Sequence, residues 1–199
     1  ATADNSSIGT DQVAWSNFAK KLQTSVNAGV PFNNNGTAGI VSTYSLVYTA
    51  AYPANAYSGG VLAFNGDIHF VPLVANRGQK ISAAGVVSTY SLVYTATAAY
   101  TGGVLSPNGD IHFVPRNAAV GQKISADGVV STYSLVYTRS SAYSGGVLDP
   151  NGNIHFVPYS ALVGQKVSAS GVVSTYSLVY AATSTYIGGV LAPNGDIHF

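Results

Sequence analysis

Apolar and polar residues alternate along much of the chain with the period of two that is typical of β-strands. In residues 129–137, Tyr133 and Leu135 fall on one face, and Thr132 and Ser134 fall on the other. Short apolar runs flank Pro-Asn-Gly-Asp and Ala-Asp-Gly, where Asn and Gly accept a positive φ at little cost, so these tetra- and tripeptides predict tight hairpin turns. Because no helical period fits this pattern, it predicts short antiparallel strands.

The strands belong to a tandem repeat. The first block, GVVSTYSLVY, begins at residues 85, 128 and 171, and recurs as GIVSTYSLVY at 39. The second block, GGVLxxNG(D/N)IHF with two variable positions x, begins at 59, 102, 145 and 188. The third block, GQK(I/V)S, begins at 78, 121 and 164. The copies of the first block are 46, 43 and 43 residues apart, and a longer loop near residues 52–56 accounts for the first spacing. Four strands in about 43 residues is the size of one β-propeller blade. We therefore expect an all-β fold, a small β-propeller of about four four-stranded blades; a twisted β-solenoid or a β-prism is the alternative.

The repeat resembles NHL-type and kelch-like propeller repeats. The likeness covers residues 39–199 and rests on GGVLxPNGDIHF, a short loop, GQKIS, an Ala-X-Gly turn and a last strand. It implies scaffolding or ligand binding, and it brings no shared catalytic residues.

The ends of the chain are out of phase with the blade. Residues 188–199 supply the two inner strands of the last blade, residues 40–48 its outer strand, and residues 28–36 a degraded third strand. This predicts that N-terminal strands complete the last blade, which hides open strand edges. The alternative is that the ends complete a neighbouring subunit, giving a larger ring or a polymer. We divide the chain into a helix and lead-in segment (1–36) and the propeller (37–199).

A short N-terminal helix is predicted because Thr10 or Asp11 can cap it and Trp15, Phe18 and Leu22 fall on one face. This apolar face either covers one end of the ring or docks onto a partner, including a second copy of the chain.

Composition removes several classes of function. Charged residues are 8% and hydrophobic residues 47%, which excludes a disordered chain. Net charge is +1 with no basic run, so no nucleic-acid partner is expected, and no apolar run approaches the roughly 20 residues of a membrane span. The chain has no Cys, hence no disulfide or Cys-ligated metal. The Gly, Tyr, Ser and Thr content is common in secreted, cell-surface and virion proteins, and we expect such an extracellular location.

Residues that could carry chemistry recur once per unit. We expect each histidine to make a structural hydrogen bond, to a Ser or Thr of the STYS strand, rather than to bind a metal. The Asp residues after the Asn-Gly turns are expected to stabilise those turns, since the third unit has Asn153 there. Lys80, Lys123 and Lys166 are expected to face solvent, with a repeated anion site as the alternative. The histidines are His69, His112, His155 and His198.

The copies differ most in the loops after the second and fourth strands. Variable loops on a rigid scaffold commonly carry binding sites, and Tyr suits sugars and protein surfaces; the alternative is that the repeated Tyr packs between blades. The candidate ligand-binding residues are Tyr57, Tyr100, Tyr143, Tyr186, Tyr159, Arg77, Arg116 and Arg139.

These observations predict a non-catalytic module that recognises a glycan or another surface polymer, or a protein surface. The alternative is a structural subunit of an extracellular filament, coat or virion, assembled by exchange of strands or helices. Because the chain has no Glu and no nucleophile motif, we expect no enzyme, no cofactor and no metal.

Overall fold

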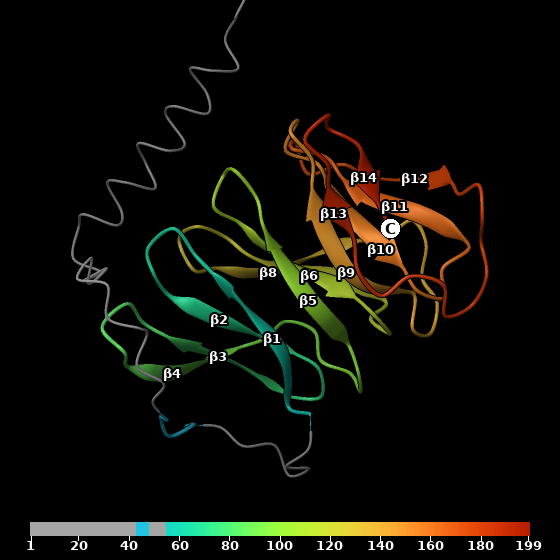
Figure 1. Ribbon diagram of the computed structural model, residues 1–199. Helices are drawn as coiled ribbons and strands as arrows, with labels where there is room; N and C mark the ends of the chain where they lie inside the picture. Colours follow the sequence, from blue (N-terminus) through green and yellow to red (C-terminus); the bar gives the residue numbers. More distant parts are fainter. Residues whose placement is uncertain (1–42, 48–54) are drawn as a thin grey trace, which may run out of the picture.

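A computed structural model describes residues 43–47 and 55–199, and its regular structure is all β. Three four-stranded antiparallel sheets follow one another along the chain, and a two-stranded sheet follows them (Figure 1). The first comprises β1 (Tyr57–Leu62), β2 (Ile68–Pro72), β3 (Arg77–Ile81) and β4 (Val87–Ser91); the second β5 (Tyr100–Leu105), β6 (Ile111–Pro115), β7 (Val120–Ile124) and β8 (Val130–Ser134); the third β9 (Tyr143–Leu148), β10 (Ile154–Pro158), β11 (Val163–Val167) and β12 (Val173–Ser177); the last β13 (Val190–Leu191) and β14 (Ile197–His198).

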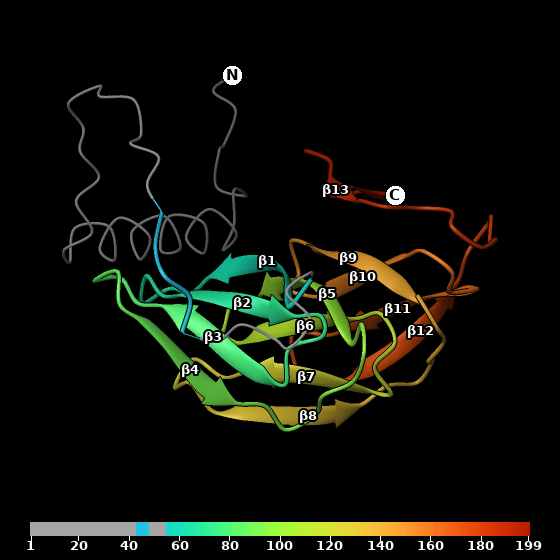
Figure 2. The same ribbon diagram turned by 90° about the horizontal axis from the view of Figure 1, so that it is seen from below.

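Each sheet is an up-and-down blade with its strands in chain order. The first strands of successive blades contact one another, β1 against β5 and β5 against β9, so the blades fan out from these inner strands (Figure 2). This is the arrangement of a β-propeller, and the predicted fold class, strand content and phase of the repeat are confirmed. Within the described residues we find no helix with the length and hydropathy needed to span a bilayer.

Glycines permit the tight turns that define each blade. Gly109, in the turn between β5 and β6, has a φ of 90°, and Gly128, in the turn between β7 and β8, has a φ of 83°. An L side chain rarely adopts such angles, which is why Gly stands at both turns in each complete unit. Non-glycine residues also adopt a positive φ in the loop that joins successive blades, at Ala98, Ser141 and Ser184.

The core lies within and between the blades. Tyr100, Phe113 and Ile111 are almost completely buried in the second blade, and Val61 of the first blade packs against them. Gln122 of β7 is fully buried, and its Oε1 accepts hydrogen bonds from the backbone N–H groups of Val93 (3.0 Å) and Tyr94 (2.8 Å) at the end of the first blade. The same contact joins the third blade to the second through Gln165. Gln122 and Gln165 therefore hydrogen-bond the second blade to the first and the third blade to the second.

The predicted completion of the last blade concerns residues that mostly lie outside the described part, as do the lead-in segment and the N-terminal helix with Trp15, Phe18 and Leu22. Of residues 40–48, the structure describes 43–47. Val47 donates its backbone N–H to Gln79 of the first blade (3.1 Å). In both ribbon views, residues 43–47 and the C-terminal strands lie at opposite ends of the row of blades (Figures 1 and 2). Among the described residues, β13 and β14 hydrogen-bond only to each other within their sheet.

Candidate functional site

A cavity opens between each pair of neighbouring blades, at the end that carries the Asn-Gly turns. The first, of about 280 Å³, lies between blades one and two and is lined by Asp67, His69 and Lys80. The second, of about 420 Å³, has Asp110, His112 and Lys123 at the same positions of the next unit. The third, of about 310 Å³, lies between the third blade and β13–β14, and is lined by Asp149, His155, Tyr176 and Asp196. The three cavities are therefore repeats of one site, with different polar groups in the third.

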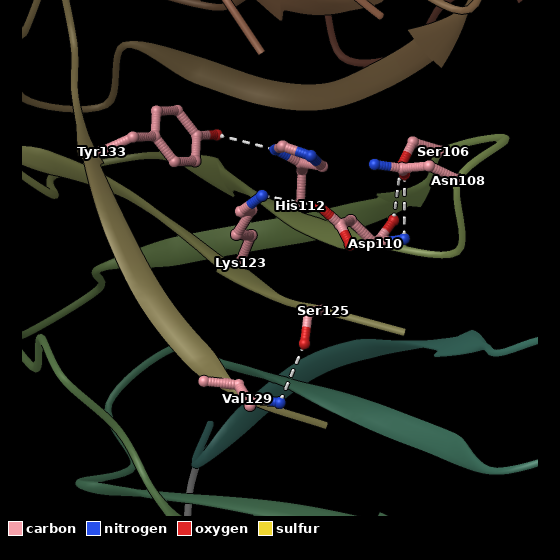
Figure 3. Close-up of polar contacts among 8 residues, drawn as sticks. All are labelled: Ser106, Asn108, Asp110, His112, Lys123, Ser125, Val129 and Tyr133. Carbon is pink, nitrogen blue, oxygen red and sulfur yellow. Dashed lines mark hydrogen bonds and ion pairs between the residues drawn. The ribbon is translucent and has the colours of Figure 1, made fainter. Parts of the chain in front are cut away.

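The second unit shows how this site is built (Figure 3). His112 follows the turn on β6, and register places it directly opposite Lys123 on β7, so the two side chains share one face of the sheet. The Nζ of Lys123 donates to Asp110 Oδ2 over 2.6 Å, and His112 Nδ1 lies 3.3 Å from the hydroxyl of Tyr133. The first unit repeats both contacts, with Lys80 on Asp67 at 2.7 Å and His69 on Tyr90 at 3.3 Å.

The charges of these two units are balanced within the blade. Burial opposes the ionisation of Asp110, but the hydrogen bond and charge of Lys123 outweigh it and hold the pKa of Asp110 below its usual value. Burial, with a contribution from Lys123, lowers the pKa of His112 to about 4. Burial also raises the pKa of the Tyr133 hydroxyl. At neutral pH the second unit therefore holds an ion pair, a neutral imidazole and a neutral phenol, which suits a structural role.

The third unit departs from this pattern at two positions. Asn153 replaces the Asp that follows the turn, and a carboxylate stands four residues earlier, at Asp149, where the second unit has Ser106. Asn153 donates its Nδ2–H to Asp149 Oδ2 over 2.7 Å, and its backbone N–H donates to Asp149 Oδ1 over 2.8 Å. The carboxylate of the second unit, Asp110, contacts a lysine, whereas that of the third unit, Asp149, contacts a histidine.

This relocation gives His155 a partner on each ring nitrogen. Its Nε2 lies 3.2 Å from Asp149 Oδ2, and its Nδ1 lies 3.3 Å from the hydroxyl of Tyr176. Burial opposes ionisation of Asp149, but hydrogen bonds from Asn153, His155 and Asn151 outweigh it and lower its pKa. An ionised Asp149 accepts a hydrogen bond from the Nε2–H of His155, which leaves Nδ1 as the acceptor for the Tyr176 hydroxyl. Burial raises the pKa of Tyr176 to about 12, so this hydroxyl keeps its proton at neutral pH.

An Asp–His–Tyr chain of this kind can move a proton. In such a chain the imidazole can accept a proton, the carboxylate orients the imidazole and stabilises its protonated form, and the phenol donates a hydrogen bond. All three side chains line one cavity. In the part of the chain that the structure describes, no group of three or more His, Asp, Glu or Cys residues is placed to hold a metal ion.

The structure corrects the candidate binding residues. Tyr100 and Tyr143 are 0% and 1% exposed, and their hydroxyls donate to the carbonyl oxygens of Val120 and Val163, so neither offers a face to a ligand. The alternative, that the repeated Tyr packs between blades, holds for these two residues. Each is the first residue of an inner strand and packs against valines of the preceding blade, Val61 and Val71 for Tyr100 and Val104 and Val114 for Tyr143. Tyr57, Tyr159 and Tyr186 are half-buried, as is Arg116, while Arg77 and Arg139 are exposed; a ligand role for these residues stays a prediction.

Three further predictions about the repeated polar residues change. The structure gives His69, His112 and His155 a tyrosine of the STYS strand as partner, where we expected a Ser or Thr. The turns are held by Asn, as when Asn108 Oδ1 accepts the N–H of Asp110 (3.1 Å), while Asp110 pairs with a lysine. Lys80 and Lys123 lie on strands that are paired on both sides and are about two-thirds buried, so they do not face solvent freely.

Sequence reasoning missed Asp149. The signal was available, because positions 149 and 153 change together in one unit of an otherwise near-identical array. We used Asn153 as an argument against a functional acid, since without coordinates nothing showed that a carboxylate four residues earlier reaches the same imidazole.

Comparisons with known proteins bear on the fold. No protein-family model matches the chain, and no curated protein matches it. Solved structures do match it. One is virginiamycin B lyase from Staphylococcus aureus, in a histidine-to-alanine form described as catalytically inactive and bound to quinupristin. It shares 21% identity over 81% of this chain and 53% of that chain, with a TM-score of 0.68. A streptogramin B lyase shares 25% identity over 69% of this chain and 45% of that one (TM-score 0.60).

A candidate 6-phosphogluconolactonase from Bacteroides uniformis shares 14% identity over 70% of this chain and 45% of that one, with a TM-score of 0.51. This chain thus spans about half the length of the structures it matches. The likeness confirms a propeller built of repeated four-stranded sheets. It also overturns our expectation of a non-catalytic adhesion module or structural subunit, because the structures that share these blades are named as enzymes.

Proposed function

We propose that this chain is an enzyme that performs acid–base chemistry on a small substrate in the third inter-blade cavity, through Asp149, His155 and Tyr176. The observation that carries the proposal is the relocated carboxylate. In the first two units the acid is paired with a lysine, and in the third it lies 3.2 Å from the imidazole. One copy of a repeat that breaks the pattern at two coupled positions, and thereby assembles a proton-transfer chain beside a cavity, is the copy in which catalysis is expected.

Each residue has a distinct role. His155 Nδ1 is the general base: it removes a proton from the substrate or from water once the substrate displaces the Tyr176 hydroxyl from it. Asp149 accepts the Nε2–H and stabilises the imidazolium that forms. Tyr176, held neutral by its raised pKa, donates a hydrogen bond to the oxygen on which negative charge develops. Asp149 is a positioning and stabilising residue, while His155 and Tyr176 contact the substrate.

The reaction class we infer is elimination or the opening of a cyclic ester. Both reactions need a base and a proton donor at a departing oxygen. The matching structures bear the names lyase and phosphogluconolactonase, and one of them is inactive without a histidine. At these identities the likeness supports the fold alone, so the residue assignments rest on the geometry of this chain.

A substrate panel with matched variants tests the proposal. Quinupristin, glucono-δ-lactone and p-nitrophenyl acetate are incubated with the wild-type chain, and turnover is followed by mass spectrometry, pH-stat titration and absorbance. We expect turnover of at least one of them, with kcat/KM reduced about 10²- to 10⁴-fold in His155→Gln. His112→Gln removes the same imidazole from the second unit and is expected to leave turnover unchanged.

Two results would contradict the proposal. One is no turnover above buffer for any member of the panel. The other is an equal effect of His155→Gln and His112→Gln, which would show that the histidines act on folding. Circular dichroism and a thermal melt of both variants identify that second case.

A further inference from the structure

We propose that Lys166 forms an anion-binding subsite beside the third cavity, and that it takes a carboxylate group of the ligand. The inference deepens the proposed function, since it rests on the same site and names the charge of its substrate. It begins from the three lysines that recur at one position of strands β3, β7 and β11.

The first two lysines have an internal carboxylate as partner. Lys80 reaches Asp67 at 2.7 Å and Lys123 reaches Asp110 at 2.6 Å. In the third unit the corresponding residue is Asn153, which is neutral, and among residues 43–47 and 55–199 no carboxylate lies within ion-pair distance of Lys166. The third unit therefore has the lysine of the other units but not the aspartate that pairs with it there.

The nearby acid is committed elsewhere. Asp149 Oδ2 accepts hydrogen bonds from Asn153 Nδ2 and His155 Nε2, and Asp149 Oδ1 accepts backbone N–H groups of Asn151 and Asn153. The side chain of Asn153 is also held, because its Oδ1 accepts the N–H of Ala169 (3.3 Å), as Asp67 Oδ1 accepts that of Ala83 (3.2 Å) in the first unit. Neither side chain can turn to Lys166 without breaking these bonds.

Register places Lys166 next to the catalytic imidazole. Lys166 and His155 are directly opposed on β11 and β10, so their side chains leave the same face of the sheet. Lys80 and Lys123, at the same position, line the first and second cavities, whereas the lining of the third includes His155 and not Lys166, which stands beside it through its pairing with His155. Lys166 is half-buried, where an ammonium group attracts an anion more strongly than it does in open water.

A ligand carboxylate beside Asn153 would therefore supply the counter-charge that Asp67 and Asp110 give to the lysines of the other units. Because Lys166 and His155 are on neighbouring strands, a substrate whose anionic group binds Lys166 would place its reacting group at the Asp149–His155–Tyr176 chain. The first two units cannot do this, because their own carboxylates occupy the lysines.

The test measures binding rather than turnover. Benzoate and its neutral isostere benzamide are titrated into the ¹⁵N-labelled chain, and the backbone amide signals of Lys166 and Ala169 are followed by NMR. We expect saturable shifts with benzoate, and at least tenfold weaker binding of benzamide. Lys166→Gln and Asn153→Asp, which supplies the internal carboxylate of the other units, are each expected to weaken benzoate binding at least tenfold. Lys123→Gln, the matched variant in the second unit, is expected to bind benzoate as the wild type does.

Absence of benzoate-dependent shifts in the wild-type chain would overturn the inference, as would wild-type affinity in Lys166→Gln or an equal loss in Lys123→Gln. The binding result is independent of the proposed reaction. Benzoate binding without turnover of any panel substrate would refute the catalytic proposal and leave the anion subsite standing, whereas turnover without benzoate binding would do the reverse.

Discussion

Removing the glutamine contact between blades measures how strongly the blades are coupled. Gln122→Met and Gln165→Met keep the length of the side chain and remove its amide. In both variants two backbone N–H groups of the preceding blade lose their acceptor, Val93 and Tyr94 in one case, Val136 and Tyr137 in the other. Since Val93 and Val136 are about 60% exposed, water replaces part of each lost bond, and the loss is near the lower end of the usual range, about 1 kcal/mol per N–H group.

The two variants should not be equal. Gln165 Nε2 donates to the carbonyl of Tyr137 (3.3 Å), whereas Gln122 Nε2 is buried with no hydrogen-bond partner among the described residues. Gln122→Met therefore also removes an unsatisfied donor, which offsets part of its cost. We expect Gln122→Met to lower the free energy of unfolding by about 1 kcal/mol and Gln165→Met by about 2 kcal/mol or more.

Urea denaturation followed by tyrosine fluorescence and circular dichroism measures both values. Hydrogen exchange of the residues at the ends of β4 and β8 reports whether the loss is local to the joint between blades. A Gln165→Met variant that is as stable as wild type, or more stable than Gln122→Met, would refute this explanation of blade coupling.

Two other predictions follow from the same structure. Burial lowers the folded-state pKa of His112 from 6.5 to about 4, so the stability contributed by the neutral imidazole is complete above pH 6.5 and is lost as the pH falls toward 4. Denaturation at pH 7 and at pH 4.5 should show that, over this range, the free energy of unfolding falls by about 2–3 kcal/mol less in His112→Gln than in wild type. Equal losses in the two proteins would contradict burial as the cause. Ala98 has a φ of 52°, a backbone angle that is unfavourable for a residue with a Cβ atom. Ala98→Gly should therefore raise the midpoint of thermal unfolding by a few degrees, which corresponds to roughly 0.5–1 kcal/mol. A lower midpoint would show that this loop is not strained.

The fold was predictable because it is written in local patterns that repeat. The Asn-Gly turn around Gly109 and the alternation in residues 129–137 fix strands and hairpins without distant contacts, and the 43-residue spacing gives the blade. The face that carries the site was not predictable in this way. Tyr100 and Arg77 stand beside variable loops, and variation alone does not distinguish a buried aromatic ring from an exposed one.

The site depends on contacts between strands. That Lys123 reaches Asp110, and that Asp149 reaches His155 instead, follows from register across β6–β7 and from side-chain direction at the turn. The sequence shows only that two positions changed together. Once the register is known, the same two changes indicate a carboxylate that has moved from a lysine to an imidazole.

The central claim is that this move makes the third unit the functional one, and a paired exchange tests it most directly. The double variant Asp149→Ser, Asn153→Asp gives the third unit the residues of the second, Ser106 and Asp110, and so restores a lysine ion pair that the fold already accommodates. Turnover of the substrate panel should fall at least tenfold while the thermal midpoint stays within a few degrees of wild type. Undiminished turnover in a folded double variant would contradict the assignment of catalysis to the Asp149–His155–Tyr176 chain.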